Sequence, residues 1–402
     1  MNLYFDRSIT FPRGFVASAV SAGIKKDKAP DLSLIYSIEP AVAAAVFTRN
    51  KFQASPIIVS RENLKKSHGK VRAIVVNSGC ANALTGERGI QTARKTAAVV
   101  AKSLDIEPTE VLVASTGVIG VQLDYDKIEK AVPKLVDQLT INYDESFARG
   151  IMTTDKFPKM CAAGVELPGG RYFRIGASAK GAGMIHPNMA TMLCFVTTDA
   201  VLRGEDAQVI LANAVSKSFN LISVDGDTST NDTVFLLANG ASGTAVTSQS
   251  DLRKFEEALT VILHQLAEMI VKDGEGATKV IHLKIQHARS FEDAVAVGKA
   301  VAVSPLVKTA IFGGDPNWGR ILSAVGNSPV NFNQRKVSLK IENVLVFNQN
   351  EPVKCNTNKL RKIFSNPEIE ITIDLAAGKQ SAEVITCDLS YEYVKINGEY
   401  TT

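Results

Sequence analysis

Residues 180–200 read KGAGMIHPNMATMLCFVTTDA and join a Gly-rich turn to a long apolar run. The apolar run that starts at Thr191 predicts a buried strand, and a β-branched residue is a natural first residue of a strand. A second interpretation is that Thr191 is a nucleophile, held between a loop on one side and rigid structure on the other. The rest of the 402-residue chain has to provide the evidence that distinguishes a strand residue from a nucleophile.

Strand-like and helix-like segments alternate on both sides of this stretch. Buried strands, rich in Val and Ile and bounded by turn residues, are predicted at 70–82, 110–120, 172–185 and 191–200. Helices are predicted at 89–106, 124–139 with a kink at Pro133, 204–223 and 251–274. The last helix carries one apolar stripe at helical spacing, which we expect in the core: Phe255, Leu259, Ile262, Leu266, Met269 and Ile270.

The C-terminal part of the chain is predicted to be richer in strands. A long helix over 290–312, interrupted near Pro305, precedes predicted strands at 336–347, 368–375 and 381–396. The sequence LAAGKQSAEV at 375–384 is typical of a hairpin. Alternating strands and helices followed by hairpin signals predict a layered α/β fold with mixed sheets and two domains.

The composition excludes several classes of function. Apolar residues make up 45% of the chain and charged residues 21%, which is typical of a globular protein. The net charge is only +4 and the basic residues do not cluster into a stripe, so we expect no nucleic acid partner. No apolar run is long enough to cross a membrane. The five cysteines include no C-x-x-C pair, so disulfides and a zinc site are not expected, and Cys194 and Cys387 are predicted core residues. This pattern favours the reducing cytoplasm.

Common catalytic signatures are absent from the sequence. It contains no G-x-S-x-G, H-E-x-x-H, P-loop or G-x-G-x-x-G motif, and its five His residues show no metal-ligand spacing. The segment DGDTSTND at 225–232 resembles a calcium loop in composition but lacks the Gly and Glu of an EF-hand. We therefore expect an Asx-rich turn there and no metal site.

A Thr nucleophile needs a base, and His186 beside a loop is not by itself evidence of one. If the chain is cut between Ala190 and Thr191, Thr191 gains an α-amine with a pKa of about 7.7–8.0, fixed covalently beside the hydroxyl that it must activate. Turns at Gly181 and Gly183 would let the backbone pass close to a ligand. Taken alone, these residues leave strand entry and self-cleavage both open.

Seven further motifs accompany residues 180–200 along the chain, in this order: NSGCANALTGERG, VLVASTGVIG, IMTTD, SVDGDTSTNDT, KDGEGATK, FGGDPNWGRIL and INGEYTT. In content and order they resemble the ornithine acetyltransferase (glutamate N-acetyltransferase) family of arginine biosynthesis. The resemblance covers the whole chain, and seven ordered motifs make it specific.

The resemblance implies a site and a reaction. In this family the chain cuts itself before the motif Thr, which implies cleavage between Ala190 and Thr191 and an acetyl group carried on Thr191. It also implies an oxyanion hole made by Thr116 and Gly117, where one donor is typically worth about 2.7–4 kcal/mol to the transition state. Lys180 would hold a substrate carboxylate and Glu275 an ammonium group. The substrate contacts implied are Thr153, Lys180, Thr191, Glu275, Asn397 and Thr402. The resemblance implies neither a metal nor a bound cofactor.

The same resemblance implies how the chain is organised. An α chain, 1–190, would hold the N-terminal α/β domain with the oxyanion hole, and a β chain, 191–402, would start at the nucleophile and hold the C-terminal α/β domain. After this N-terminal-nucleophile-like processing the two would stay together, as an α2β2 heterotetramer. N2-acetylornithine would acylate Thr191 and ornithine would leave before L-glutamate takes the acetyl group, a ping-pong reaction.

Three questions stay open at the level of sequence. Some members of the family also accept acetyl-CoA as donor, and these residues do not decide whether this chain does. A self-cleaving aminopeptidase or amidase of the same superfamily would share the chemistry of Thr191 but pass the acyl group to water. A non-catalytic binding protein on the same scaffold would remain uncut.

Overall fold

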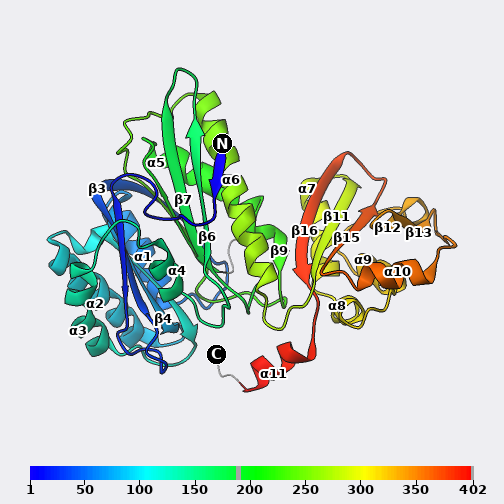
Figure 1. Ribbon diagram of the computed structural model, residues 1–402, viewed down its shortest axis with the longest axis horizontal. Coiled ribbons are helices and arrows are strands. Elements are labelled where there is room, and N and C mark those ends of the chain that lie inside the picture. The colour runs from blue at the N-terminus through cyan, green and yellow to red at the C-terminus, as the bar shows by residue number, and fades with distance from the viewer. Residues whose placement is uncertain (187–191, 400–402) are drawn as a thin grey trace.

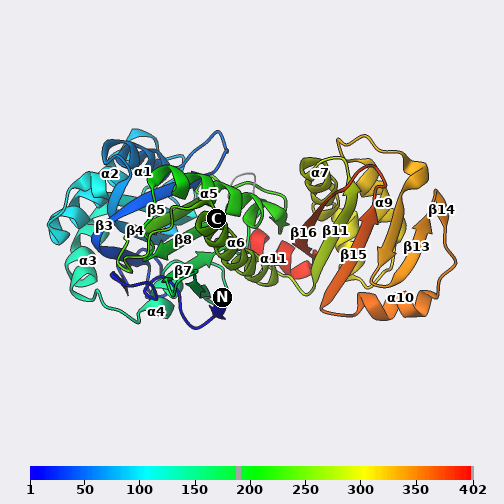
Figure 2. The same cartoon turned by 90° about the horizontal axis from the view of Figure 1, so that it is seen from above.

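The computed structural model describes residues 1–186 and 192–399, which form a larger and a smaller lobe. Helix α6 (Gln249–Lys272) lies on the side of the larger lobe that faces the smaller one (Figures 1 and 2). Each lobe is built on one sheet. Among the described helices, no single one is long and apolar enough to cross a membrane.

The sheet of the larger lobe has nine strands. Their spatial order is β1 (Asn2–Tyr4), β6 (Lys159–Glu166), β7 (Tyr172–Lys180), β8 (Leu193–Thr198), β10 (Thr233–Ala238), β3 (Leu32–Phe47), β4 (Lys70–Cys80) and β5 (Val111–Val118), with β2 (Phe15–Val20) paired to β3. β7 and β8 are antiparallel, whereas β8 with β10, and β4 with β5, are parallel. The mixed sheet predicted from the sequence is therefore confirmed.

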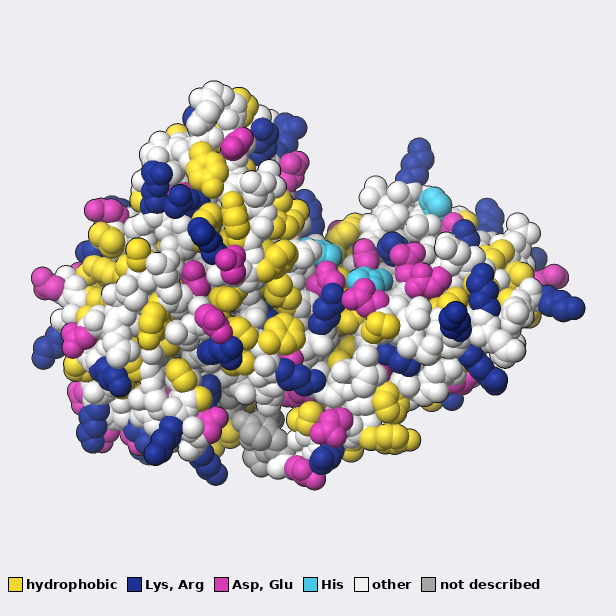
Figure 3. All heavy atoms as spheres, in the orientation of Figure 1, with side chains coloured by type: hydrophobic (Ala, Val, Ile, Leu, Met, Phe, Trp, Pro, Cys, Tyr) yellow, Lys and Arg dark blue, Asp and Glu magenta, His cyan; other side chains and the backbone are white. Residues whose placement is uncertain are grey.

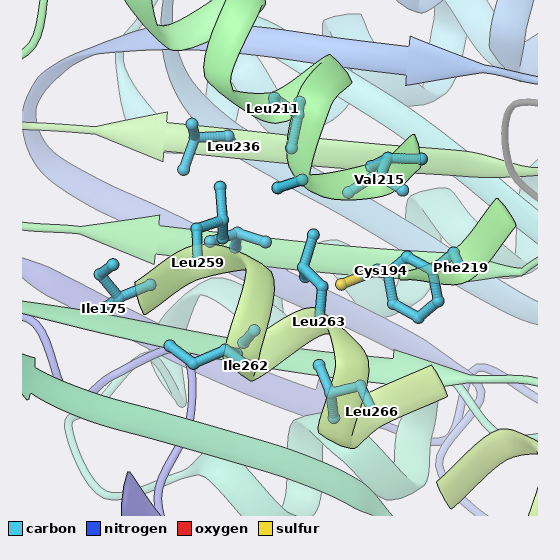
Figure 4. Packing of buried hydrophobic residues seen from close by; sticks show 14 of the residues in the cluster. Ile175, Cys194, Leu211, Val215, Phe219, Leu236, Leu259, Ile262, Leu263 and Leu266 are labelled. Carbon is cyan, nitrogen blue, oxygen red and sulfur yellow. The ribbon is translucent and has the colours of Figure 1, made fainter. Parts of the chain in front are cut away.

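Two cores lie on opposite faces of this sheet. Cys194 of β8 points into the core formed with α5 (Gly204–Ser216) and α6, as Figure 4 shows, whereas the next residue, Phe195, lies in the core of the other face. The predicted stripe of α6 is buried here, with only Met269 partly exposed. Fully burying one Leu or Ile contributes about 1.5–3 kcal/mol, so this stripe fixes α6 against β6 and β7.

Four further helices of the larger lobe pack against its sheet, three of them on the half formed by β3, β4 and β5. They are α1 (Ser55–Lys66), α2 (Gly86–Leu104), α3 (Tyr125–Asp137) and α4 (Asp144–Gly150). Helices α1, α2 and α3 share a third core with β3, β4 and β5. The helices predicted at 89–106 and 124–139 correspond to α2 and α3.

The smaller lobe has a seven-stranded sheet backed by helices. Its strand order is β14 (Glu351–Pro352), β13 (Val344–Asn348), β12 (Ser338–Ile341), β15 (Glu368–Asp374), β11 (Val280–Ala288), β16 (Gln380–Cys387) and β9 (Ile222–Ser223). The helices are α7 (Phe291–Ala302), α8 (Pro305–Phe312), α9 (Trp318–Gly326) and α10 (Thr357–Phe364). The predicted interruption near Pro305 is confirmed, because α7 and α8 meet at a bend of 59°.

Two predictions for the C-terminal part are wrong. The segment read as a hairpin does not form one, because β11 lies between β15 and β16, parallel to the first and antiparallel to the second. The predicted strand over 381–396 ends at Cys387, and its second half forms helix α11 (Tyr391–Glu399). Here Ser390 and Tyr391 contact Gly276 and Phe312, so tertiary contacts override the strand propensity of the tyrosines and valine.

Candidate active site

A pocket with a cavity volume of about 130 Å³, open to solvent, lies where several strands of the larger sheet begin or end. All six predicted site residues that the structure describes line it: Thr116, Gly117, Thr153, Lys180, Glu275 and Asn397. Ala190, Thr191 and Thr402 lie outside the described residues. Met192 and Leu193, which follow Thr191 in the chain, also line the pocket.

The turn at Thr116 and Gly117 is shaped by the parallel pairing of β4 and β5. Gly117 pairs with Gly79 and has a φ of +128°, in the region that favours glycine. A Cβ on Gly117 would lie 2.4 Å from the carbonyl carbon of Gly79, so no other residue fits without movement of the strands. The Asn231 side chain donates to the carbonyl oxygen of Ser115 at 2.9 Å, which holds the end of β5 against the start of β10.

Lys180, at the end of β7, links two of the predicted residues. Its ammonium group donates to Oγ1 of Thr153 at 2.8 Å and to Oγ1 of Thr116 at 3.3 Å. Because each hydroxyl accepts a hydrogen bond from Lys180, its own O–H remains able to donate a hydrogen bond elsewhere. Thr116 lines the pocket next to Gly117, so its hydroxyl is available as a donor there.

A buried group of charged side chains next to Lys180 holds its ammonium group in place. Asp155 accepts from the N–H of Gly181 at 2.7 Å and lies 3.7 Å from the Lys180 ammonium group. Lys159 pairs with Asp155 at 2.7 Å and with Asp273 at 2.6 Å, and these three side chains have no solvent exposure. Burial raises the pKa of Asp155, but the charges of Lys180 and Lys159 outweigh it, so the pKa lies below the ordinary value.

Glu275 lines the pocket beside the Gly-rich turn, and its N–H donates to the carbonyl oxygen of Ala182 at 2.9 Å. A Cβ on Gly183 would lie 2.4 Å from Oε2 of Glu275, so the turn needs glycine for the carboxylate to approach. Asn397 of α11 donates to Oε2 of Glu275 at 2.9 Å. Ser390, just before α11, donates to the carbonyl oxygen of Gly276 at 2.6 Å. The C-terminal segment is therefore tied to the pocket, and α11 lies between the two lobes (Figures 1 and 2).

The segment at 225–232, predicted as an Asx-rich turn, contributes more to the pocket than the sequence indicated. Asp225, Asp227, Ser229, Asn231 and Asp232 line it. The carboxylate of Asp225 accepts from the N–H groups of Met184 and Ile185 at 2.6 and 2.8 Å. These bonds hold the loop that leads to residue 187. Two sequence signals pointed to this segment: its density of Asp and Asn, and its match to one of the ordered family motifs.

Neither a metal site nor a catalytic His is evident in the described part of the chain. In residues 1–186 and 192–399, no group of His, Cys, Asp and Glu side chains could hold a metal ion. Nδ1 of His186 lies 3.1 Å from the Ser223 hydroxyl, and His186 does not line the pocket. Burial, together with the charge of Lys299, lowers the pKa of His186 to about 4.

A family model described as the ArgJ family matches residues 16–402. The chain belongs to the ArgJ family. It is 47% identical over 390 residues to the arginine biosynthesis bifunctional protein ArgJ of Nitratidesulfovibrio vulgaris, covering 97% of this chain and 98% of that one. It is also 47% identical over 408 residues to the glutamate N-acetyltransferase of Methanocaldococcus jannaschii, covering 99% of each. The family predicted from the ordered motifs is confirmed.

Two solved structures have sequences similar to this chain. Ornithine acetyltransferase from Mycobacterium tuberculosis, complexed with ornithine, is 38% identical, with a TM-score of 0.43, covering 47% of this ArgJ-family chain and 99% of that one. The arginine biosynthesis bifunctional protein from Bacillus halodurans is 40% identical, with a TM-score of 0.44, covering 47% of this chain and 98% of that one.

Proposed function

We propose that this ArgJ-family chain is a glutamate N-acetyltransferase that moves the acetyl group of N2-acetylornithine to L-glutamate. The acetyl group would be carried on Thr191, after the chain has cut itself between Ala190 and Thr191. The observation that carries this proposal is the pocket, which gathers Thr116, Gly117 and Lys180 next to the start of β8.

In the first half-reaction the Thr191 hydroxyl would attack the acetyl carbonyl carbon, with its proton going to the new α-amine of the same residue. The Thr116 hydroxyl and the Gly117 N–H would hold the oxyanion of the tetrahedral intermediate. The C–N bond then breaks, the leaving nitrogen takes the proton, and ornithine departs. L-Glutamate repeats these steps in reverse with its own α-amine and leaves as N-acetylglutamate.

The charged residues of the pocket suit substrates that are amino acids. Both substrates have a carboxylate, for which Lys180 offers a positive charge, and Glu275 offers a negative charge for an ammonium group. Both side chains are largely buried, at 7% and 6% exposed, so their interactions with a substrate would be only weakly screened by solvent.

We also propose that the two chains stay together after cleavage, as an α2β2 heterotetramer in the cytoplasm. Strands from both sides of the cut support the first part: β7 and β8 are antiparallel neighbours, and β3 lies beside β10. Separating the two chains would expose the interior of one sheet. Under native conditions the two pieces should co-elute at the mass of two α and two β chains.

The decisive experiment compares the wild-type chain with Thr191→Ala and Thr191→Ser. Wild type should run as two pieces under denaturing conditions, the second starting Thr-Met-Leu-Cys, and N2-acetylornithine alone should add one acetyl mass to that piece. The Ala variant should stay uncut and inactive, while the Ser variant should still be cut. Assays with glutamate and either N2-acetylornithine or acetyl-CoA identify the donor. Active protein that runs as one full-length band would contradict the proposal.

A further inference from the structure

Self-cleavage poses a problem that the α-amine of Thr191 cannot solve, because that amine does not exist until the chain is cut. Attack of the Thr191 hydroxyl on the Ala190 carbonyl must take a proton from the oxygen and give one to the departing nitrogen. The uncut chain therefore needs another group that can accept one proton and donate another. The titratable side chains that line the pocket are Lys180, Asp225, Asp227, Asp232, Glu275 and Tyr393.

Most of these groups are already engaged or exposed. Lys180 donates to two hydroxyls. Asp225 accepts from two backbone N–H groups with its two oxygens. Glu275 accepts from Asn397, and Asp227 is exposed to solvent. Partial burial, together with the negative charges of Asp225 and Glu275, raises the pKa of Tyr393 above the ordinary value.

Asp232 differs from the others. It is 2% exposed, and its Oδ2 has no hydrogen-bond partner among the described residues. A buried, unpartnered polar atom is costly, and its retention at a pocket calls for an explanation. Burial raises the pKa of Asp232 well above the ordinary value, and hydrogen bonds of Ser229 and the charge of Lys180 offset only part of that rise. The raised pKa favours the protonated form of this carboxyl.

Asp232 is also close to the proposed cut. It directly precedes β10, whose first residue, Thr233, pairs in parallel with Leu193 of β8. The N–H of Thr233 donates to the carbonyl oxygen of Met192 at 2.9 Å. Met192 is the residue after Thr191, and both Met192 and Asp232 line the pocket.

From this position we infer that Asp232 relays the proton during self-cleavage of the chain. This inference rests on the proposed cut between Ala190 and Thr191. One oxygen of the carboxyl accepts the proton of the Thr191 hydroxyl while the other gives its proton to the Thr191 nitrogen. The bond between the Ala190 carbonyl carbon and that nitrogen breaks, and an ester bond to Oγ forms. Water then hydrolyses the ester, leaving the Ala190 carboxylate and the free hydroxyl and amine of Thr191, with Asp232 unchanged.

The test is Asp232→Asn, which keeps the size of the side chain but cannot relay a proton. Proton transfer by a positioned group typically contributes about 10²–10⁴-fold, so cleavage should slow by at least about 100-fold. Cleavage is followed on denaturing gels, and circular dichroism and the melting temperature report whether the uncut variant is folded. A folded Asn variant that is cut as fast as wild type overturns the inference.

Two control variants separate proton relay from other effects. Asp199→Asn changes another buried Asp just beyond the other end of β8, where it accepts from the N–H groups of Arg13 and Arg174, and it should still be cut. His186→Asn should also be cut, and loss of cleavage in this variant alone would assign the relay to His186 instead. If the Asp232→Asn change prevents folding, Asp232→Glu decides: a folded Glu variant should be cut slowly, and one that stays uncut overturns the inference. A wild-type chain that is never cut would instead refute the proposed function.

Discussion

The buried group of charges beside Lys180 and the surface of the smaller sheet both contain short ion pairs, but the two pairs differ in their exposure to solvent. In the buried group, Nζ of Lys159 lies 2.6 Å from Oδ2 of Asp273, and neither side chain is exposed to solvent. On the smaller sheet, Lys284 lies 2.5 Å from Glu370, and these side chains are 39% and 38% exposed. Figure 3 shows charged side chains of both signs gathered with His on the right-hand lobe.

The comparison teaches that distance alone does not set the importance of an ion pair. In the buried group, Asp155 and Asp273 carry two negative charges, and Lys159 and Lys180 carry two positive ones, so each charge is balanced only while all four are present. Removing one partner of a buried pair leaves an uncompensated charge, which costs about 3–5 kcal/mol. A surface pair is worth about 0–1 kcal/mol, because water replaces the missing partner.

The largest effect is expected for Lys159→Met. This change leaves Asp155 and Asp273 buried without their shared cation, so the protein should lose about 3–5 kcal/mol of stability in urea unfolding. The measurement is best made in a Thr191→Ala background, so that every sample is one intact chain. The matched control is Lys284→Met, which should lose no more than about 1 kcal/mol. Equal losses in the two variants would refute the comparison.

A second effect is expected where the buried group meets the proposed chemistry. Thr116→Ala removes the hydroxyl that Lys180 orients, so kcat for acetyl transfer should fall by about 10²–10³-fold, the equivalent of roughly 2.7–4 kcal/mol. KM should change little, because an oxyanion donor acts mainly in the transition state. Thr116→Ser keeps the hydroxyl and should retain most of the activity. An effect confined to KM would make Thr116 a ground-state contact.

The ordered motifs predicted six of the described residues that share the pocket. These six come from β5, the loop after α4, β7, the turn after α6, and α11, and the structure brings them together at one pocket. The roles given to these residues stay predictions. Several elements of the larger lobe were also predicted from their apolar periodicity, among them β4, β5, β8, α2 and α6. The elements β3, β6, β10 and α1 were not predicted from the sequence.

Other features depend on contacts between distant parts of the chain. Lys159 and Asp273 are 114 residues apart, and neither the spacing nor the composition of their segments indicates that they pair. The hairpin prediction failed because β11, some ninety residues upstream of β15, takes the place between β15 and β16. Asp232 was assigned to a turn, since burial of a carboxyl at the start of β10 cannot be read from its neighbours in sequence.

The smallest effect is expected for the pair of His282 and Glu383, which lie 2.9 Å apart across β11 and β16. The hydrogen bond to Glu383 raises the pKa of His282 above its ordinary value of 6.5, although burial opposes the rise. A raised folded-state pKa means that the pair stabilises the protein fully below pH 6.5, and that this contribution is lost as pH rises through the folded-state pKa.

His282→Gln should therefore be less stable than its parent by up to about 1 kcal/mol at pH 5.5, and the gap should close by pH 9. The parent is again the uncut Thr191→Ala chain, compared by urea unfolding at each pH. The Lys159→Met variant provides the contrast. The pKa of Asp155 is lowered from 3.8, so the contribution of that carboxylate is present above pH 3.8 and is lost only as pH falls further. Its deficit should stay constant between pH 5.5 and 9, and a His282→Gln gap that widened with rising pH would show that the imidazole does not act as the cation of its pair.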